Sequence, residues 1–295
     1  MELNPSEHHE QWGEGNPQKI KVLMYHRVVN AVNVSYAYPG MCISTQEFHN
    51  QMSMLERWGF TSITFEDYRL FLRGELNLPK KPVILTFDDA YLDFHENAFP
   101  VLEEFGMRSV VFCVADKKLS ANFWDKSNGL PLAPLMNEQQ LLELHAAGHE
   151  IGSHSLTHPI LPRLVREKAW DEIYRSRMML EILLNAPVKT FAFPYGNLND
   201  ATKKMVQDAG YETACATFSG PPKFASDPFE IRRTLIQGNL SPLHFALMLF
   251  TPYEYVGWLR WKLKKLFRGG GAASAKPPAS PGISSHEPAH DPAAH

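Results

Sequence analysis

The sequence predicts an α/β protein built on a parallel sheet with enough strands to close into a barrel. Short runs rich in Val, Ile, Phe and Thr alternate with stretches whose apolar residues recur at helical spacing. The alternation continues from residue 20 to residue 236 and provides seven or eight strands. An open, doubly wound sheet is the alternative, but the sequence has no Gly-rich phosphate loop such as GxGxxG to support a nucleotide site.

The elements follow one another in a regular order. The predicted strands are 20–25, 61–65, 83–87, 109–114, 149–153, 189–193, 212–216 and 230–236. Between them, capping residues and glycines delimit the predicted helices. Ser44 or Thr45 begins a helix that ends near Gly59, residues 96–105 form a helix before Gly106, Asn137 caps 138–147, a long periodic stretch covers 164–184, and Asn199 caps 200–209.

Composition divides the chain into four parts and excludes several classes of protein. We expect a flexible arm over 1–17, a catalytic domain over 18–252, a basic amphipathic helix over 253–268 and a disordered tail over 269–295. The net charge of −3 argues against a nucleic-acid partner. Three cysteines without a CxxC motif suggest neither a disulfide framework nor a cysteine zinc site. The N-terminal residues lack the pattern of a secretory signal, so we expect a cytoplasmic protein.

Polar clusters follow three of the predicted strands directly. Asp88 and Asp89 come after 83–87, the segment 154–158 with two histidines after 149–153, and the segment 194–196 after 189–193. Because the carboxyl ends of parallel strands share one rim, we expect these clusters to converge. One aspartate and two histidines would leave an open coordination position, as hydrolytic zinc sites require. An earlier His-x3-His pair, His145 and His149, is interrupted by Gly148 and is interpreted as packing or capping.

These segments carry motifs that resemble those of the polysaccharide deacetylase family, also called the NodB-homology or carbohydrate esterase family 4 group. TFDDAY at 86–91, GHEIGSHSLTHP at 148–159 and FAFPYG at 191–196 resemble its first three motifs. MYHRV at 24–28 and DPFEIRR at 227–233 resemble flanking segments of its poly-N-acetylglucosamine deacetylase-like branch. The resemblance extends over residues 20–250.

The resemblance implies a distorted (β/α) barrel that carries a metal-dependent amide hydrolase. Matched by position, Asp89, His154 and His158 would bind a divalent metal ion, most often Zn²⁺, and Asp88 would be the general base. The backbone N–H of Tyr195 would help the ion to hold the tetrahedral oxyanion. The implied substrate is an N-acetylated amino sugar, in a glycan or in a lipid-linked glycan precursor.

Two departures from the family pattern concern catalytic groups. In many members the third motif carries an arginine that orients the base. Here that stretch reads Phe-Ala-Phe and has no arginine. Arg233 is the preferred candidate for this role, ahead of Arg232. Many members also carry a late Leu-x-x-His that supplies the general acid. His244 has the wrong leucine spacing for this role and is interpreted as a packing residue in a helix, and His26 is either the acid or a structural residue.

Aromatic residues near the motifs are candidates for contacts with a sugar ring. Trp124, in the long 116–135 loop, is the strongest of them. Core packing is the alternative for the other candidates. The residues predicted to bind substrate are Tyr91, Trp124 and Pro194, and Phe193 is a further ring that can line the subsite.

Several functional alternatives stay open at the level of sequence. The motif residues bind only the reacting carbonyl and the water, so deformylation or hydrolysis of another non-peptide amide fits them as well. A catalytically inactive carbohydrate-binding module is the third alternative. Residues 253–268 combine a leucine stripe, two tryptophans and five basic residues, which predicts peripheral binding to an anionic membrane surface. The competing interpretation is a helix that packs its stripe against the barrel.

Overall fold

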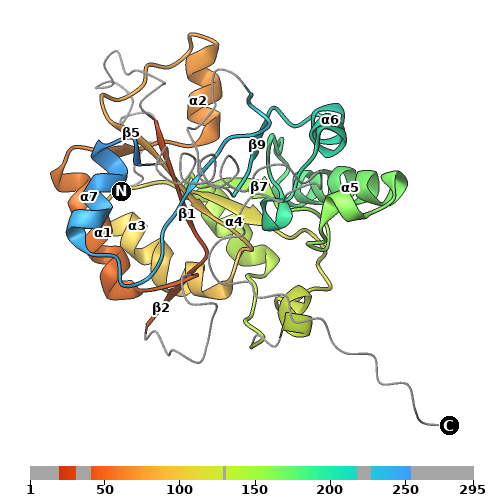
Figure 1. Ribbon diagram of the computed structural model, residues 1–295, viewed down its shortest axis with the longest axis horizontal. Coiled ribbons are helices and arrows are strands. Elements are labelled where there is room, and N and C mark those ends of the chain that lie inside the picture. Colours follow the sequence, from red (N-terminus) through yellow and green to blue (C-terminus); the bar gives the residue numbers. More distant parts are fainter. Residues whose placement is uncertain (1–19, 31–40, 129–130, 218–226, 254–295) are drawn as a thin grey trace, which may run out of the picture.

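A curved parallel sheet forms the centre of the molecule, with helices packed around it (Figure 1). The computed structural model describes residues 20–30, 41–128, 131–217 and 227–253. The sheet has eight strands, seven of them in the order β10-β1-β5-β6-β7-β8-β9, while β4 pairs with the start of β5. The strands are β1 (Lys21–Tyr25), β4 (Thr61–Ser62), β5 (Pro82–Phe87), β6 (Val110–Cys113), β7 (Glu150–Ser153), β8 (Thr190–Ala192), β9 (Thr213–Cys215) and β10 (Thr234–Leu235).

The two edges of this sheet are joined by one short segment, residues 231–235. Ile231 forms a parallel bridge with Cys215 of β9, and β10 then pairs with β1 through Thr234 and Leu23. The segment therefore closes the sheet into the distorted barrel that the sequence predicts. Its register also points Arg233 into the barrel, where the side chain is buried.

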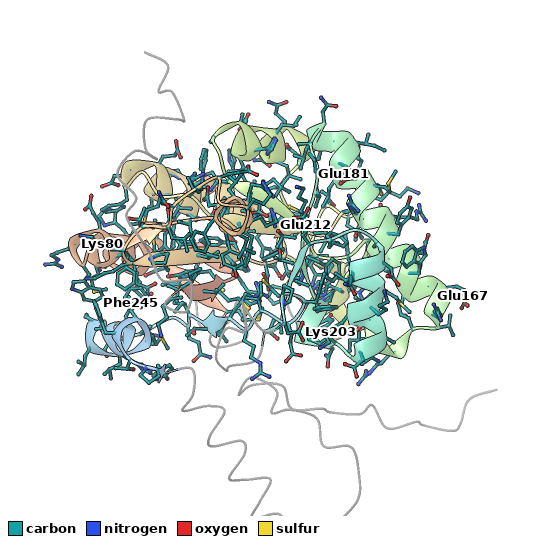
Figure 2. All side chains as sticks on the ribbon, turned by 90° about the horizontal axis from the view of Figure 1, so that it is seen from above. Lys80, Glu167, Glu181, Lys203, Glu212 and Phe245 are labelled. Atoms are coloured by element: carbon teal, nitrogen blue, oxygen red, sulfur yellow. The ribbon has the colours of Figure 1, made fainter. Side chains whose placement is uncertain are left out.

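Seven α-helices surround the sheet in the part of the chain that the structure describes. They are α1 (Thr45–Arg57), α2 (Phe65–Leu72), α3 (Phe99–Glu104), α4 (Glu138–Ala146), α5 (Arg166–Leu184), α6 (Asp200–Asp208) and α7 (Pro242–Phe250). α5 and α6 lie at one side of the barrel, and α1 and α7 at the opposite side (Figure 1). Figure 2 shows the same separation from above, with Glu167 and Glu181 of α5 far from Phe245 of α7.

Short helical turns complete the framework. They are the π-helix η3 (Phe94–Ala98) and the 3₁₀-helices η4 (Phe123–Asn128), η5 (Leu161–Arg163) and η6 (Pro194–Gly196). The predicted helix 96–105 is thus the end of η3 followed by α3, and Pro100 lies in the first turn of α3.

Capping chemistry starts three of the helices where the sequence predicts. Ser44, Asn137 and Asn199 each accept a hydrogen bond from the third residue of the helix, and the side chain of that third residue returns a bond to the cap. This reciprocal capping box satisfies two backbone donors that would otherwise be unpaired. Helix starts are therefore predictable from a few neighbouring residues.

Two of the predicted strands are reduced to two residues each. Only Thr61 and Ser62 of 61–65 are in a strand, because Thr64 and Asp67 form a capping box that begins α2 at Phe65. Only Thr234 and Leu235 of 230–236 are in a strand, since Ile231 makes an isolated bridge. The small sheet of β2 (Arg27–Val29) and β3 (Cys42–Ser44) was not predicted.

Alternating side chains of the strands build two cores. One core fills the barrel interior and includes Val22, Ile84, Phe112 and Cys215. The other lies between the sheet and the helices and includes Leu23, Leu85 and Val111. This alternation fixes which strand residues can point into the barrel and which face the helices.

The remaining domain predictions lie outside the described residues. These are the arm 1–17, almost all of the basic helix 253–268 and the tail 269–295. Among the residues that the structure does describe, none of the helices combines the length and the apolarity needed to span a bilayer.

Candidate active site

The predicted clusters meet at the carboxyl ends of neighbouring strands. β5 runs into Asp88 and Asp89, β7 into His154, and β8 is followed within two residues by the turn η6. The backbone N–H of Asp88 donates to the carbonyl of Tyr25 at the end of β1, and that of His154 donates to Cys113 at the end of β6. The sheet itself therefore positions the side chains of the site.

Asp89, His154 and His158 form a compact buried group that can hold a metal ion. The Nε2 atoms of His154 and His158 lie 3.5 and 3.3 Å from Asp89 Oδ1 and 3.2 Å from each other. His154 comes from the strand end and His158 from the loop that follows. The His-x3-His spacing here joins a strand end to the following loop and not two turns of one helix.

The donor set of this group fits a divalent cation. The Nδ1 atom of His154 lies 2.8 Å from the carbonyl oxygen of Ala192, which accepts only if Nδ1 carries the proton, so Nε2 presents a lone pair to the group. Asp89 Oδ1 is buried and has no donor among the described residues. Burial and the neighbouring charge of Asp88 raise the pKa of Asp89, and burial lowers the pKa of His158. A bound cation would counter both effects by favouring the carboxylate and the neutral imidazole.

Asp88 has a different environment, although it is the next residue in the chain. Burial alone would raise the pKa of Asp88, but the guanidinium of Arg233 holds that pKa far below its usual range. Arg233 donates to both carboxylate oxygens, through Nη1 at 2.6 Å and Nη2 at 2.7 Å. It is itself held by the carbonyl of Ala216 and the hydroxyl of Thr86. Arg232 instead bonds Glu230, so the structure brings the predicted arginine to the base.

His26 follows β1 and lies close to Asp88. Its Nδ1 atom is buried and has no hydrogen-bond partner in the described part of the chain. Burial lowers the pKa of His26 to about 4, opposed by the charge of Asp88 and reinforced by that of Arg233. His244, by contrast, is on α7 and its Nε2 lies 2.6 Å from the hydroxyl of Tyr253, so its ring has a partner away from the metal-binding group.

Two aromatic rings frame His158. Trp124 of η4 stacks on the imidazole with 4.7 Å between ring centroids, and Tyr195 of η6 meets it edge-on at 4.5 Å. Trp124 is only partly buried, which leaves ring surface for a substrate. The predicted contact residue Trp124 therefore lies directly beside the candidate metal ligands.

The other predicted substrate residues are less accessible. The side chain of Tyr91 is only 3 % exposed and contacts Arg27, which lies 5.2 Å from the ring centroid. Pro194 and Phe193 are buried as well. Their burial argues against stacking on a sugar ring. Tyr91 instead hydrogen-bonds Asp89, which favours the ionised carboxylate.

The backbone of the site is unusually rich in left-handed conformations. Asp89, Ala90, Ser155, His158 and Tyr195 all have positive φ between 55° and 73°. Such residues persist only where the surrounding structure over-determines them, and they concentrate at functional sites. Gly196 adds a further constraint, because a Cβ at this position would overlap the side chain and backbone of Thr217.

The earlier histidine pair diverges as expected. His149 is buried at the start of β7, where its Nδ1 accepts from the backbone N–H of Ser109 at 3.1 Å. His145 is exposed on the last turn of α4. The two rings do not form a second ligand pair.

Comparison with known proteins agrees with this geometry. Residues 75–214 match the family model described as polysaccharide deacetylase. The chain contains a polysaccharide deacetylase domain. All four residues of the Asp88, Asp89, His154 and His158 set lie inside the matched segment.

Curated relatives extend the match beyond this domain toward both ends of the chain. The chain is 24 % identical over 230 residues to the YxkH protein of Bacillus subtilis, whose name places it in the same family, covering 78 % of this chain and 76 % of the relative. It is 26 % identical over 245 residues to the poly-β-1,6-N-acetyl-D-glucosamine N-deacetylase of Escherichia coli K12. That match covers 72 % of this chain and 36 % of the relative, so the chain spans about a third of that protein.

Solved structures share the fold of the deacetylase domain. The Streptococcus pyogenes deacetylase PplD superposes with a TM-score of 0.67 at 24 % identity, covering 78 % of this chain and 98 % of the other. IcaB from Ammonifex degensii superposes with a TM-score of 0.63 at 22 % identity, covering 81 % and 97 %. Both likenesses support the barrel with helices around it.

One buried acidic residue of the deacetylase site escaped the sequence analysis. Asp125 of η4 is 7 % exposed, and its negative charge raises the pKa of both Asp89 and Tyr91. Its place beside Trp124 in NFWD was the available signal. The sequence separation between Asp125 and Asp89 follows no helix or strand period, because a long loop brings the two residues together.

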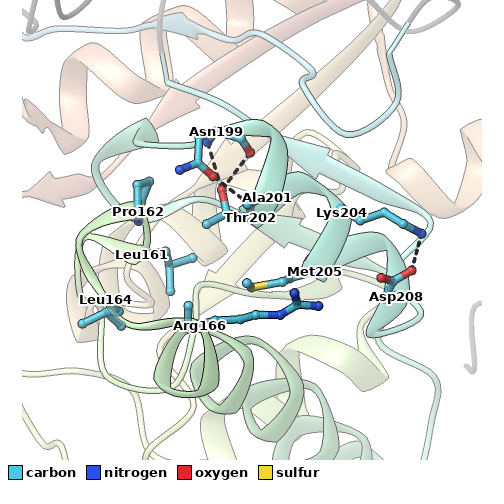
Figure 3. Close-up of a pocket in the computed structure, with 11 residues that line it drawn as sticks. Leu161, Pro162, Leu164, Arg166, Asn199, Ala201, Thr202, Lys204, Met205 and Asp208 are labelled. Atoms are coloured by element: carbon cyan, nitrogen blue, oxygen red, sulfur yellow. Dashed lines mark hydrogen bonds and ion pairs between the residues drawn. The ribbon is translucent and has the colours of Figure 1, made fainter. Parts of the chain in front are cut away.

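A separate cavity of about 270 Å³ lies between α5 and α6 (Figure 3). Leu161, Ala169 and Met205 are among its apolar lining residues, and Arg166 and Lys204 are its cations. None of the deacetylase site residues lines it. The predicted site residues therefore lie at the strand-end rim, apart from this cavity.

Proposed function

We propose that this chain is a metal-dependent hydrolase that removes N-acetyl groups from an amino sugar. The observation that carries the proposal is the difference between two adjacent carboxylates. Asp89 faces two histidines, whereas Asp88 accepts two hydrogen bonds from Arg233. Asp89, His154 and His158 would hold the ion, for which Zn²⁺ is the best candidate because two imidazoles and one carboxylate suit it. When bound, the ion would polarise the acetyl carbonyl and lower the pKa of a water molecule.

Asp88 would act as the base in this reaction. The bidentate bonds from Arg233 keep its carboxylate ionised and fix its orientation, which a base needs in order to accept a proton from water. The water oxygen would attach to the acyl carbon as Asp88 takes the proton. The backbone N–H of Tyr195, in its left-handed turn, would stabilise the oxyanion.

The leaving nitrogen needs a proton when the C–N bond breaks. The proton that Asp88 has taken from water is available for this purpose. His26 is the candidate to relay this proton, because it is buried beside Asp88, its Nδ1 atom has no partner among the described residues, and burial keeps its imidazole neutral near pH 7. His26 would then release it to the nitrogen, which gives acetate and a free amine.

The test measures acetate and formate release together with metal content. We expect the Zn²⁺-loaded enzyme to release acetate from N-acetylglucosamine oligomers, and His154→Ala to lose both the metal and the activity. The matched control is His145→Ala, an exposed histidine that should change neither. A His154→Ala variant with full metal occupancy would reject the ligand assignment.

The same assay separates the alternatives. Formate release from N-formyl substrates without acetate release would favour a deformylase. Binding of the oligomers without release of either acid would favour an inactive carbohydrate-binding module. No contact of the site favours a deformylase, and the bidentate pair of Asp88 with Arg233 supports an active hydrolase over an inactive module.

We also propose that the chain binds the cytoplasmic face of a membrane peripherally and acts on a lipid-linked sugar. The sequence of residues 253–268 supports this with five basic residues and no acid after Glu254. The helix before it, α7, adds apolar side chains that face outward: Leu243 is 71 %, Leu247 43 % and Phe250 53 % exposed. Lys81 lies 5.5 Å from the Phe250 ring, so the patch has a cation beside it.

Vesicle flotation tests this proposal. The full chain should float with vesicles that contain anionic phospholipid, and less so as salt is added. A full-length variant with Lys262, Lys264 and Lys265 changed to Glu should stay in solution. Equal flotation of the two, or none by either, would reject the membrane proposal and favour a soluble saccharide.

A further inference from the structure

Buried aspartates of this domain are paired with arginines, with two exceptions. Five aspartates are buried: Asp67, Asp88, Asp89, Asp93 and Asp125. Three of them form ion pairs: Asp67 with Arg108, Asp88 with Arg233, and Asp93 with Arg27. A buried carboxylate without a cation or strong donors is costly, so each exception needs a partner.

The first exception is explained by the candidate metal site, but the second is not. Asp89 belongs to the group that fits a cation. Asp125 does not belong to that group, and its carboxylate receives one bond, from the amide of Asn122 to Oδ2 at 3.0 Å. Within the described residues, Oδ1 of Asp125 has no protein donor. This oxygen can therefore accept a hydrogen bond from a bound molecule.

The loop that carries Asp125 is firmly attached to the strand end beside the metal-binding group. The backbone N–H of Met136 donates to Ala90, that of Leu92 to Pro134, and Leu135 bridges Tyr91. Inside the loop, the Asn122 side chain accepts from the backbone N–H of Ala133 at 2.6 Å. Asn122 thus links the base of the loop to the carboxylate. Asp125 is a fixed feature of the site wall and not a side chain of a loose loop.

The neighbour of Asp125 shows what kind of molecule this wall faces. Trp124 lies on His158 and keeps part of its ring accessible. An accessible indole next to a carboxylate with a free acceptor presents an apolar face and a hydrogen-bond acceptor side by side. A pyranose ring offers the complementary surfaces, a C–H face and equatorial hydroxyl donors.

We propose that Asp125 is a substrate-binding residue that accepts a hydrogen bond from a ring hydroxyl of the N-acetylated sugar, and so selects which sugars the site accepts. This inference rests on the proposed deacetylase function. Asp125 would hold the sugar while Asp88 and the metal ligands act on the acetyl group. Its contribution is to binding, so it should appear in KM more than in kcat.

The test compares Asp125→Asn with wild type on N-acetylglucosamine oligomers and on their mono-deoxy analogues. We expect kcat/KM to fall about 10- to 100-fold, mostly through KM, because a bond to a charged acceptor is lost. Metal content and Tm should stay unchanged. With wild type, kcat/KM for one of the deoxy analogues should fall by a similar factor relative to the parent oligomer. With Asp125→Asn, kcat/KM for that analogue and for the parent oligomer should be equal. Asp116→Asn is the matched control, because its partly exposed side chain accepts a hydrogen bond only from the backbone N–H of Lys118 in the described part of the chain.

Binding without turnover gives a second readout. Titration of the oligomers into Asp88→Asn and into Asp88→Asn/Asp125→Asn should give a Kd weaker by about 10- to 100-fold in the double variant. If wild type hydrolyses no oligomer, the proposed function fails, while this titration still tests the role of Asp125. Weaker metal binding by Asp125→Asn would overturn the inference. So would equal Kd values for the single and the double variant. So would losses of kcat/KM that add to that of Asp125→Asn for every deoxy analogue.

Discussion

At the scale of single residues, Asp88 and Asp89 show how two adjacent carboxylates acquire different chemistry. The pKa of Asp88 is held down by Arg233, whereas burial and the charge of Asp88 raise the pKa of Asp89. The left-handed backbone at Asp89 turns its side chain away from the arginine and toward the histidines. Adjacent positions at one strand end therefore have the environments that the proposed base and the proposed metal ligand need.

The geometry of the Arg233 clamp predicts the effect of a conservative change. Arg233→Lys keeps the positive charge but loses the planar fork that bonds both oxygens of Asp88. We expect turnover to fall about 10- to 100-fold, because the base is less well oriented, with the metal content unchanged.

Arg232→Lys is the control for this change. Its side chain pairs with Glu230, away from Asp88, and the pair is partly exposed. Steady-state kinetics and metal analysis of both variants decide the matter. Equal losses of turnover for the two, or no loss for Arg233→Lys, would remove Arg233 from the mechanism.

At the scale of elements, the turn η6 couples backbone conformation to the site. Tyr195 and Gly196 both have positive φ, and Gly196 lies against Thr217 just after β9. The turn thus packs against the neighbouring strand connection and holds the Tyr195 ring on His158. This contact leaves no room for a side chain at position 196.

Two glycines with nearly equal φ separate steric overlap from backbone strain. Gly106→Ala, at φ 58° with open space around it, should cost about 1 kcal/mol of the free energy of unfolding. Gly196→Ala, at φ 61°, should cost roughly 1–3 kcal/mol more, because the new methyl meets Thr217. Denaturant unfolding measures both values, and equal costs would show that the contact with Thr217 is unimportant.

Local signals predicted the elements well and long-range contacts poorly. Ser44, Asn137 and Asn199 were identified because a cap depends on residues three positions away. The β-branched run at 61–65 predicted a strand that is too long, because Thr64 caps α2 and is not a strand residue. The short parallel pair of β2 and β3 has no local pattern at all.

The same distinction applies to the site. Asp88, Asp89 and His154 were predictable because they follow directly on strands, and His158 because it completes the His-x3-His spacing in the next loop. Asp125 was not, since only the hydrogen bonds between the 121–136 loop and residues 90–92 bring it to Asp89. Sequence spacing cannot show which way such a loop folds. The predicted roles of Tyr91 and Pro194 assumed exposure that the packing does not provide.

At the scale of the whole molecule, closure of the barrel assembles the candidate catalytic machinery. His26 follows the first strand, and Arg233 lies in the segment that joins β9 to β1. The base and its arginine are 145 residues apart in sequence, yet they form a buried bidentate pair. Without the 231–235 segment the sheet would still exist, but Asp88 would lose the charge that orients it.

Acetate release by Asp88→Asn tests the account most directly, because Asp88 is the one residue that must act on water without holding the ion. Wild type and variant are loaded with Zn²⁺ to equal content, and acetate release from N-acetylglucosamine oligomers is followed. We expect the variant to retain the metal and to lose about two to four orders of magnitude in turnover. Turnover within a factor of about two of wild type at equal metal content would contradict this expectation.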